Sequence, residues 1–312
     1  MPAARFSIRC SSALVACLLA SAAAAQQGRD STAKPAQFEF ELGLGAEYDS
    51  NVSISEIDAS SNEGDYALTM DASLEVKKEF SPDFDMAATY DFSQTLYEEF
   101  SEVDRQTHIF GADAAWNGSR LDRGLSLYYI NSRLDGKDFL DYYRASPSLS
   151  GFIARNWFAR GAYVYSDKSI VETPDRDADT HSGEADLYYF RRGLRSYFNL
   201  GYRYKSEDAV DQRYDYHSNS LKLRYIHRFN LFQRLAKLEL SWRYEDRDYS
   251  SPTPSIGEDR SDDRHRWRAD LEVPLVGGAF AQVYYGYSNY DSNYPSADYT
   301  QSLVGSRFFY RW

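Results

Sequence analysis

The feature that most constrains the fold is a period-two alternation of apolar and polar side chains that begins at Phe38 and continues to Trp312. In its first run, residues 38–48, the even positions carry Phe, Leu, Ala or Tyr and the odd positions carry Glu or Gly. Successive side chains of a strand point to opposite faces, so one face of each run suits lipid and the other suits water.

Further runs follow around residues 68–76, 84–92, 104–117, 121–131, 138–151, 156–166, 180–191, 194–205, 214–229, 233–245, 263–275, 279–288 and 298–312. Each is near the ten or so residues that a tilted membrane-spanning strand requires. We therefore predict an all-β fold, a transmembrane antiparallel up-and-down β-barrel of about 14 strands. With both termini in the periplasm, the number of strands is even.

The connections alternate in length, as expected when short periplasmic turns face long external loops. Short links fall at residues 80–83, 117–120, 191–193 and 276–278, and long acidic stretches fall around 49–65, 166–179, 246–262 and 288–297. None of these loops is obviously long enough to fold inward as the constriction of a trimeric porin. We therefore expect a monomer.

Two other fold classes fit the sequence poorly. Beyond the first 25 residues no apolar run approaches the roughly 20 residues of a membrane-spanning helix. A soluble β-sandwich or lipocalin-like barrel needs an apolar interior, whereas the inner face here carries carboxylates such as Glu39, Asp71 and Asp91. Burying many unpaired carboxylates costs several kcal/mol each, so the inner face indicates a water-filled or densely ion-paired lumen.

The N-terminus reads as an export signal, with Arg5 and Arg9 before a short apolar run and a series of alanines. We expect a signal peptide over residues 1–25, a short polar leader over 26–37 and the barrel over 38–312. An alternative reading makes Cys17 the acylated residue of a lipoprotein. Both cysteines, Cys10 and Cys17, lie in the signal, which leaves the mature chain without thiol chemistry.

Charge excludes one class of partner. The formal net charge is −12, and it becomes −14 when Arg5 and Arg9 leave with the signal. An acidic chain of this kind has no general affinity for nucleic acid.

The last residues of the chain form an alternating aromatic series, Phe308, Tyr310 and Trp312. This series resembles the terminal signal by which the barrel assembly machinery recognises outer-membrane proteins, although that signal usually ends in Phe. It predicts export to the outer membrane of a Gram-negative bacterium, where membrane lipid and lipopolysaccharide surround the barrel.

Catalytic motifs are weak throughout, and we expect no enzyme, catalytic residue, metal or cofactor. The five histidines are scattered, and there is no Gly-x-Ser-x-Gly elbow or phosphate-binding loop. His217 and Ser218 are neighbours on one strand, so their side chains point to opposite faces. The alternating Asp175, Asp177 and Asp179 lack the central glycine and distant Glu of a calcium loop.

The inner face of the predicted barrel carries the most informative residues. The early strands supply an acidic arc and the late strands a basic one. The pore-lining acidic candidates are Glu39, Glu41, Asp71, Glu75 and Asp91, and the pore-lining basic candidates are Arg243, Arg264, Arg266, Arg268 and Arg307.

Arg264, Arg266 and Arg268 form one inward column because they occupy alternate positions of one strand. Two accounts of the column stay open. It is either a structural ion ladder with Glu239 and Glu245 of the preceding strand, or a polarised pore wall that orients a zwitterionic or anionic solute.

The segment 42–52, with residues 214–216, 244–249 and 288–293, resembles the barrels of the surface lipoprotein assembly modifier family. The resemblance implies a fourteen-stranded barrel that works with a periplasmic tetratricopeptide domain to move lipoprotein clients to the cell surface. No such helical part is present in this sequence, so a separate periplasmic partner would have to recruit the client.

The sequence therefore favours a pore or translocation channel for hydrophilic cargo with a charge-segregated lumen. Two alternatives remain. One is a lipoprotein-translocation barrel with a separate periplasmic partner, and the other is a structural or adhesive surface barrel plugged by its own side chains.

Overall fold

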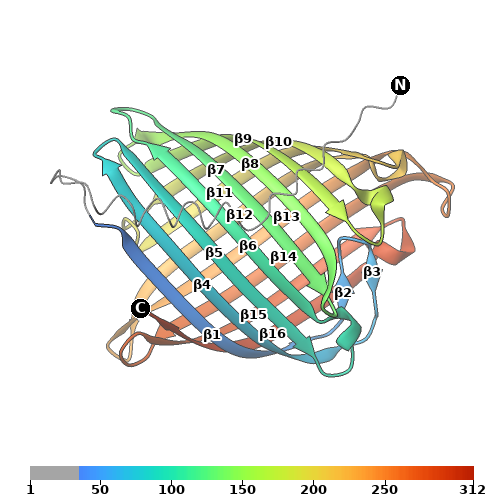
Figure 1. Cartoon of the computed structure of the whole chain (residues 1–312), viewed down its shortest axis with the longest axis horizontal. Coiled ribbons are helices and arrows are strands. Elements are labelled where there is room, and N and C mark those ends of the chain that lie inside the picture. Colours follow the sequence, from blue (N-terminus) through green and yellow to red (C-terminus); the bar gives the residue numbers. More distant parts are fainter. Residues whose placement is uncertain (1–34) are drawn as a thin grey trace.

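The computed structural model describes residues 35–312, and these residues form a closed antiparallel barrel of 14 strands (Figure 1). The strands follow one another around the wall, and β16 pairs with β1 to close it. The predicted up-and-down barrel is confirmed. The expected signal peptide, residues 1–25, and residues 26–34 of the expected leader lie outside the described residues.

The wall strands are long and tilted (Figure 1). They are β1 (Gln37–Asp49), β4 (Asp65–Ser81), β5 (Phe84–Tyr97), β6 (Arg105–Trp116), β7 (Asp122–Leu134), β8 (Lys137–Ala154), β9 (Trp157–Ile170), β10 (Ala178–Phe190), β11 (Ser196–Ala209), β12 (Tyr216–Leu231), β13 (Arg234–Thr253), β14 (Glu258–Pro274), β15 (Ala279–Ser292) and β16 (Tyr299–Arg311). Two short strands, β2 (Ser53–Ile54) and β3 (Ala59–Ser60), form a separate hairpin between β1 and β4.

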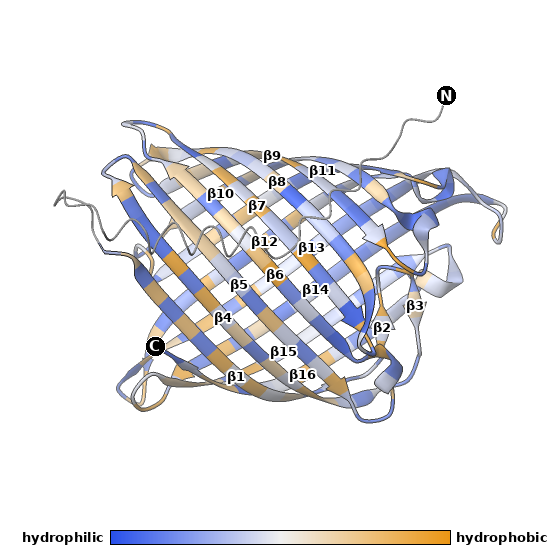
Figure 2. Cartoon of the chain, viewed as in Figure 1, coloured by the Kyte–Doolittle hydropathy of each residue, from blue (hydrophilic) through white to orange (hydrophobic). Residues whose placement is uncertain are grey.

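The outer wall is apolar because the even positions of β1 and their equivalents elsewhere point outward. Phe38 and Leu44 are 66% and 64% exposed, whereas Asp49 on the opposite face is 2% exposed. Figure 2 shows the resulting alternation of hydrophobic and hydrophilic residues along the strands. An exposed face of this kind is unfavourable in water and favourable in lipid, since burial of apolar surface is the main stabilising term.

Aromatic side chains gather near both ends of the strands. The ring centroids of Phe84 and Trp116 lie 5.1 Å apart near one end, and those of Tyr48 and Tyr66 lie 4.9 Å apart near the other. Two such belts are typical of barrels whose aromatic rings sit at the two membrane interfaces.

The two ends of the barrel differ. At the end where β1 begins and β16 finishes, here called the turn end, the connections are 82–83, 117–121, 155–156, 191–195, 232–233 and 275–278. At the opposite end, the loop end, they are 50–64, 98–104, 135–136, 171–177, 210–215, 254–257 and 293–298.

The prediction of a long loop over residues 246–262 is wrong. β13 continues to Thr253 and β14 starts at Glu258, and the two strands stay paired through Asp246 with Asp263 and Arg247 with Asp262. The polar sequence reads as a loop, but backbone pairing between neighbouring strands continues beyond the apolar band.

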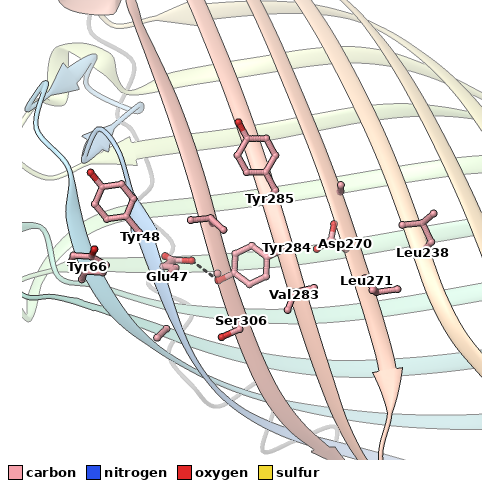
Figure 3. A pocket seen from close by; sticks show the side chains of 14 residues that line it. Glu47, Tyr48, Tyr66, Leu238, Asp270, Leu271, Val283, Tyr284, Tyr285 and Ser306 are labelled. Atoms are coloured by element: carbon pink, nitrogen blue, oxygen red, sulfur yellow. Dashed lines mark hydrogen bonds between the residues drawn. The ribbon is translucent and has the colours of Figure 1, made fainter. Parts of the chain in front are cut away.

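Glycines on the inner face let a side chain cross from one strand to the next but one. Tyr284 of β15 and Glu47 of β1 are both paired in register with Gly305 of β16, and the Tyr284 hydroxyl donates a hydrogen bond to Glu47 Oε2 at 2.6 Å (Figure 3). Gly201 likewise separates Asp186 from Lys222, whose Nζ lies 3.0 Å from Asp186 Oδ1. A Cβ atom at Gly305 would collide with the Tyr284 ring.

We expect Gly305→Ala to displace the Tyr284 ring and to destabilise the barrel by about 1–3 kcal/mol, because a methyl group is forced into occupied space. Gly183→Ala is the matched control, since nothing lies within 4 Å of the added Cβ atom. Urea unfolding of the refolded barrel measures both. Equal stability of the two variants would show that the glycine is not needed for the crossing.

Candidate functional site

The segment 50–64, here called the mouth hairpin, folds into the loop end of the lumen (Figure 1). Its Glu56 side chain forms a two-point ion pair with Arg105 of β6, at 2.9 and 3.1 Å. Its Asp58 side chain pairs with Arg260 of β14, on a different part of the wall. The expectation that no loop folds inward is therefore wrong. The acidic residues of this loop find arginines on the inner wall, and these contacts hold the loop inside.

Asn51 fixes the point at which the hairpin leaves β1. Its Oδ1 atom accepts hydrogen bonds from Ser60 Oγ at 2.7 Å and from the Asn62 backbone N–H at 2.9 Å. Its Nδ2 atom donates to the Thr300 carbonyl at 3.1 Å. Asn51 is 5% exposed, so one buried amide ties both arms of the hairpin to the start of β16.

The tip of the hairpin is held by an arginine cluster. Arg260 donates two hydrogen bonds of 2.9 Å to Asp58, and Arg176, in the loop after β9, donates one of 2.8 Å. Arg260 also binds Asp262 Oδ1 at 2.7 Å, and Arg264 binds Asp262 Oδ2 at 2.8 Å. Two-point pairs of this kind are the strong form of a charge-assisted hydrogen bond.

The charges of this cluster are buried, with Asp58 8% and Arg260 3% exposed as whole residues. Burial alone would raise the pKa of Asp58, but hydrogen bonds and charge from Arg260 and Arg176 outweigh it and hold that pKa well below 3.8. The pKa of Glu56 is also lowered, because Arg105 outweighs the effect of burial.

A group whose pKa falls on folding stabilises the fold above its unfolded pKa. The contribution of Asp58 is therefore fully present above about pH 4, and it is lost only as the pH falls through the depressed value.

Beneath the mouth hairpin lies a polar cavity of about 240 Å³. Eight basic side chains line it against four acidic ones. The basic residues are Arg144, Lys168, Arg176, Arg203, Lys205, Arg247, Arg264 and Arg266, and the acidic ones are Glu56, Asp58, Glu184 and Glu207. The cavity is thus rich in positive charge in a chain whose formal net charge is −12.

The three arginines of the predicted column have different partners. Arg264 pairs with Asp262 and lies 3.6 Å from Asp58, and Arg268 pairs with its own strand neighbour Asp270 at 3.0 Å. Arg266 lies 3.6 Å from Glu245, as the ion-ladder account expected.

The other acidic residue of the expected ladder, Glu239, does not face the column. It pairs with Arg224 at 3.1 Å and with Lys237 at 3.2 Å, and in register it faces Asp270. Arg243 lies directly opposite Arg266, and no carboxylate among residues 35–312 forms an ion pair with it.

Arg307 lies among the predicted acidic residues rather than beside the arginine column. It pairs with Glu41 at 2.5 Å and with Asp71, and Arg311 also pairs with Glu41, at 2.6 Å. Closure of the barrel between β1 and β16 brings these early and late residues together.

The remaining acidic candidates lie on β1, β4 and β5. Glu39 is opposite Glu75 in register and pairs with Arg311 at 3.3 Å. Asp91 is opposite Ser73, within electrostatic range of Glu41.

Five residues that hold the mouth hairpin were not predicted from the sequence: Glu56, Asp58, Arg105, Arg176 and Arg260. A signal was available for Arg260, which is in phase with Arg264 on β14. No pattern marked Asp58, because a loop carboxylate gives no indication of the distant arginines that it meets.

The terminal aromatic residues all point outward. Phe308 and Trp312 are 63% and 60% exposed, and the Trp312 ring lies 5.1 Å from that of Phe40 on β1. Recognition of this series by the assembly machinery stays a prediction.

Other sites are not evident in the described part of the chain. Residues 35–312 contain no group of three or more His, Cys, Asp or Glu side chains placed to hold a metal ion. No helix in the same range is long and apolar enough to cross a membrane. His217 contacts Tyr204 on the outer face while Ser218 is buried, so the two do not meet.

No protein-family model matches this sequence, and no curated protein matches it. Solved structures do match. OmpT, an outer membrane protein of Vibrio cholerae, superposes with a TM-score of 0.51 at 7% identity, over 91% of this chain and 100% of that chain. A loop L8 deletion mutant of OmpT gives 0.50 at 8% identity, over 89% and 100%. An anion-selective porin from Comamonas acidovorans gives 0.49 at 8% identity, over 90% and 100%.

At these identities the likeness to OmpT shows the fold alone. Together with the closed wall and its apolar exterior, it defines the class of protein: an outer-membrane β-barrel. Location in the outer membrane fits this class.

We expect Asp58→Asn to release the mouth hairpin, because Arg260 and Arg176 lose a charged partner. Cleavage of the folded barrel by an endoprotease specific for Glu, at Glu56 and Glu63, should become at least about tenfold faster as the open state becomes more populated. Asp135→Asn is the control, since Asp135 is exposed and pairs with exposed Lys137. Unchanged cleavage in Asp58→Asn would contradict the anchoring role of this carboxylate.

Proposed function

We propose that the chain forms a channel for hydrophilic solutes across the outer membrane, with its loop end outside and its selectivity set beneath the mouth hairpin. The observation that carries the proposal is the polar cavity of about 240 Å³, lined by eight basic and four acidic side chains. A lumen wall with an excess of one charge favours solutes of the opposite charge, so we expect preference for anions.

In this proposal the lumen is charge-segregated, with an acidic wall and a basic wall that are joined by ion pairs where β1 meets β16. The β1 and β4 carboxylates meet Arg307 and Arg311, whereas Arg243 of β13 has no ion pair among residues 35–312 and the cavity beneath the mouth hairpin is lined by twice as many basic as acidic side chains. We infer that solutes pass along the basic side, under the hairpin, where the excess charge lies.

A second candidate is a closed surface barrel, favoured by the mouth hairpin itself. The hairpin is held by buried ion pairs to β6 and β14, which fits a permanent plug as well as a constriction. The resemblance to surface lipoprotein assembly modifiers supports a third candidate, translocation of a lipoprotein with a periplasmic partner. We propose no enzymatic activity.

Single-channel recording of the refolded barrel in a planar bilayer tests the channel. We expect discrete conductance steps, a reversal potential that indicates anion preference in a salt gradient, and larger steps for Asp58→Asn because the hairpin no longer narrows the mouth. Asp135→Asn should behave as the wild type.

A silent wild type together with a silent Asp58→Asn would contradict the channel and favour the closed barrel. Cation preference would contradict the proposed path along the basic wall.

A further inference from the structure

An unusual row of basic residues crosses three neighbouring strands on the inner wall. Lys222 of β12 is directly opposite Arg243 of β13, and Arg243 is directly opposite Arg266 of β14. Side chains at directly opposed positions have Cβ atoms about 4.5–5.5 Å apart, and like charges there destabilise a sheet. The row needs a source of negative charge.

The ion pairs of the row form at its two edges, at Lys222 and Arg266. Lys222 reaches across Gly201 to Asp186, at 3.0 Å. Arg266 has Glu245 at 3.6 Å, a longer contact than the 2.9 Å between Glu245 and Arg247. Arg243, in the middle, forms no ion pair with any carboxylate of residues 35–312. Arg203, Arg224 and Arg266 lie within electrostatic range of it, and the one carboxylate in that range, Glu245, is already paired with Arg247 and Arg266.

The neighbouring carboxylates are already engaged. Glu184 is shared by three arginines, with Arg144 at 3.4 Å, Arg160 at 3.5 Å and Arg203 at 3.9 Å. Glu245 is 1% exposed and enclosed by its own partners. Each of these carboxylates therefore already has cationic partners of its own.

The row also faces accessible space. Arg203 and Arg266 line the cavity beneath the mouth hairpin, and the side chain of Arg266 is 39% exposed. Guanidinium groups present planar forks of donors that match the oxygens of phosphate, sulfate and carboxylate.

We propose that Arg203, Arg243 and Arg266 bind an oxyanion, a phosphate, sulfate or carboxylate group carried by a solute in the lumen. This site rests on the proposed function in one respect: the oxyanion is the class of solute that the proposed channel would select. Since the row faces the lumen and not the apolar exterior, the ligand is a dissolved solute rather than a lipid headgroup.

Calorimetric titration of the refolded barrel in detergent with inorganic phosphate, at low ionic strength in chloride, tests the site directly. We expect Arg243→Gln to weaken phosphate binding at least about tenfold, because a charge-assisted contact is lost. Arg234→Gln is the matched control. It removes the same charge from the same strand, but Arg234 is exposed at the turn end and donates only to the Pro274 carbonyl.

Thermal unfolding gives a second readout that does not depend on the variant's own stability. Phosphate should raise the Tm of the wild type and of Arg234→Gln, because a ligand stabilises the state that binds it, and should raise that of Arg243→Gln by less at the same phosphate concentration. Absence of phosphate binding to the wild type, or equal weakening in both variants, would overturn the site.

Channel recordings test the oxyanion site and the proposed channel separately. A conducting barrel whose current is insensitive to phosphate overturns the site and leaves the channel standing. A silent barrel that binds phosphate through Arg243 overturns the channel and leaves the site standing.

Discussion

The structure depends on pairing of charge inside a closed wall. A closed barrel satisfies the backbone hydrogen bonds of all its strands. Every inward side chain then lies in the lumen, and in this chain many of those side chains are charged. A buried charge without a partner costs several kcal/mol, so the inward carboxylates and guanidinium groups must find one another or water. Pairs such as Asp58 with Arg260 and Glu41 with Arg307 meet this requirement across distant parts of the sequence.

Two local features make this pairing possible. Glycines such as Gly201 have no side chain, so partners on the two strands that flank the glycine's own strand can meet across it. The mouth hairpin brings two further carboxylates into a region rich in arginine, so it both narrows the mouth and neutralises part of its charge. Constriction and electrostatic balance therefore have one cause, and a change at Asp58 should affect both.

Sequence reasoning predicted the wall well and its interior less well. The alternation from Phe38 onward identified all fourteen wall strands, because the period of a strand is local and its two faces meet different solvents. The alternation did not predict the part of β13 after Glu245, where a polar sequence continues as a strand. Pairing there depends on the neighbouring strand.

The mouth hairpin was missed because its position is set by long-range pairs. The partner of Asp58 lies about two hundred residues away, and no local pattern identifies it. The same limit applies to the arginine column. Its inward direction follows from period two, but its carboxylate partners do not.

A double-mutant cycle between Asp58 and Arg260 tests the central claim, that ion pairs across the lumen hold the hairpin in the mouth. The free energies of unfolding of the wild type, Asp58→Asn, Arg260→Gln and the double variant give the coupling energy. The account predicts a favourable coupling of about 0.5–3 kcal/mol, as found for residues in direct contact. Additive effects would show that the two side chains do not stabilise one another, and would contradict it.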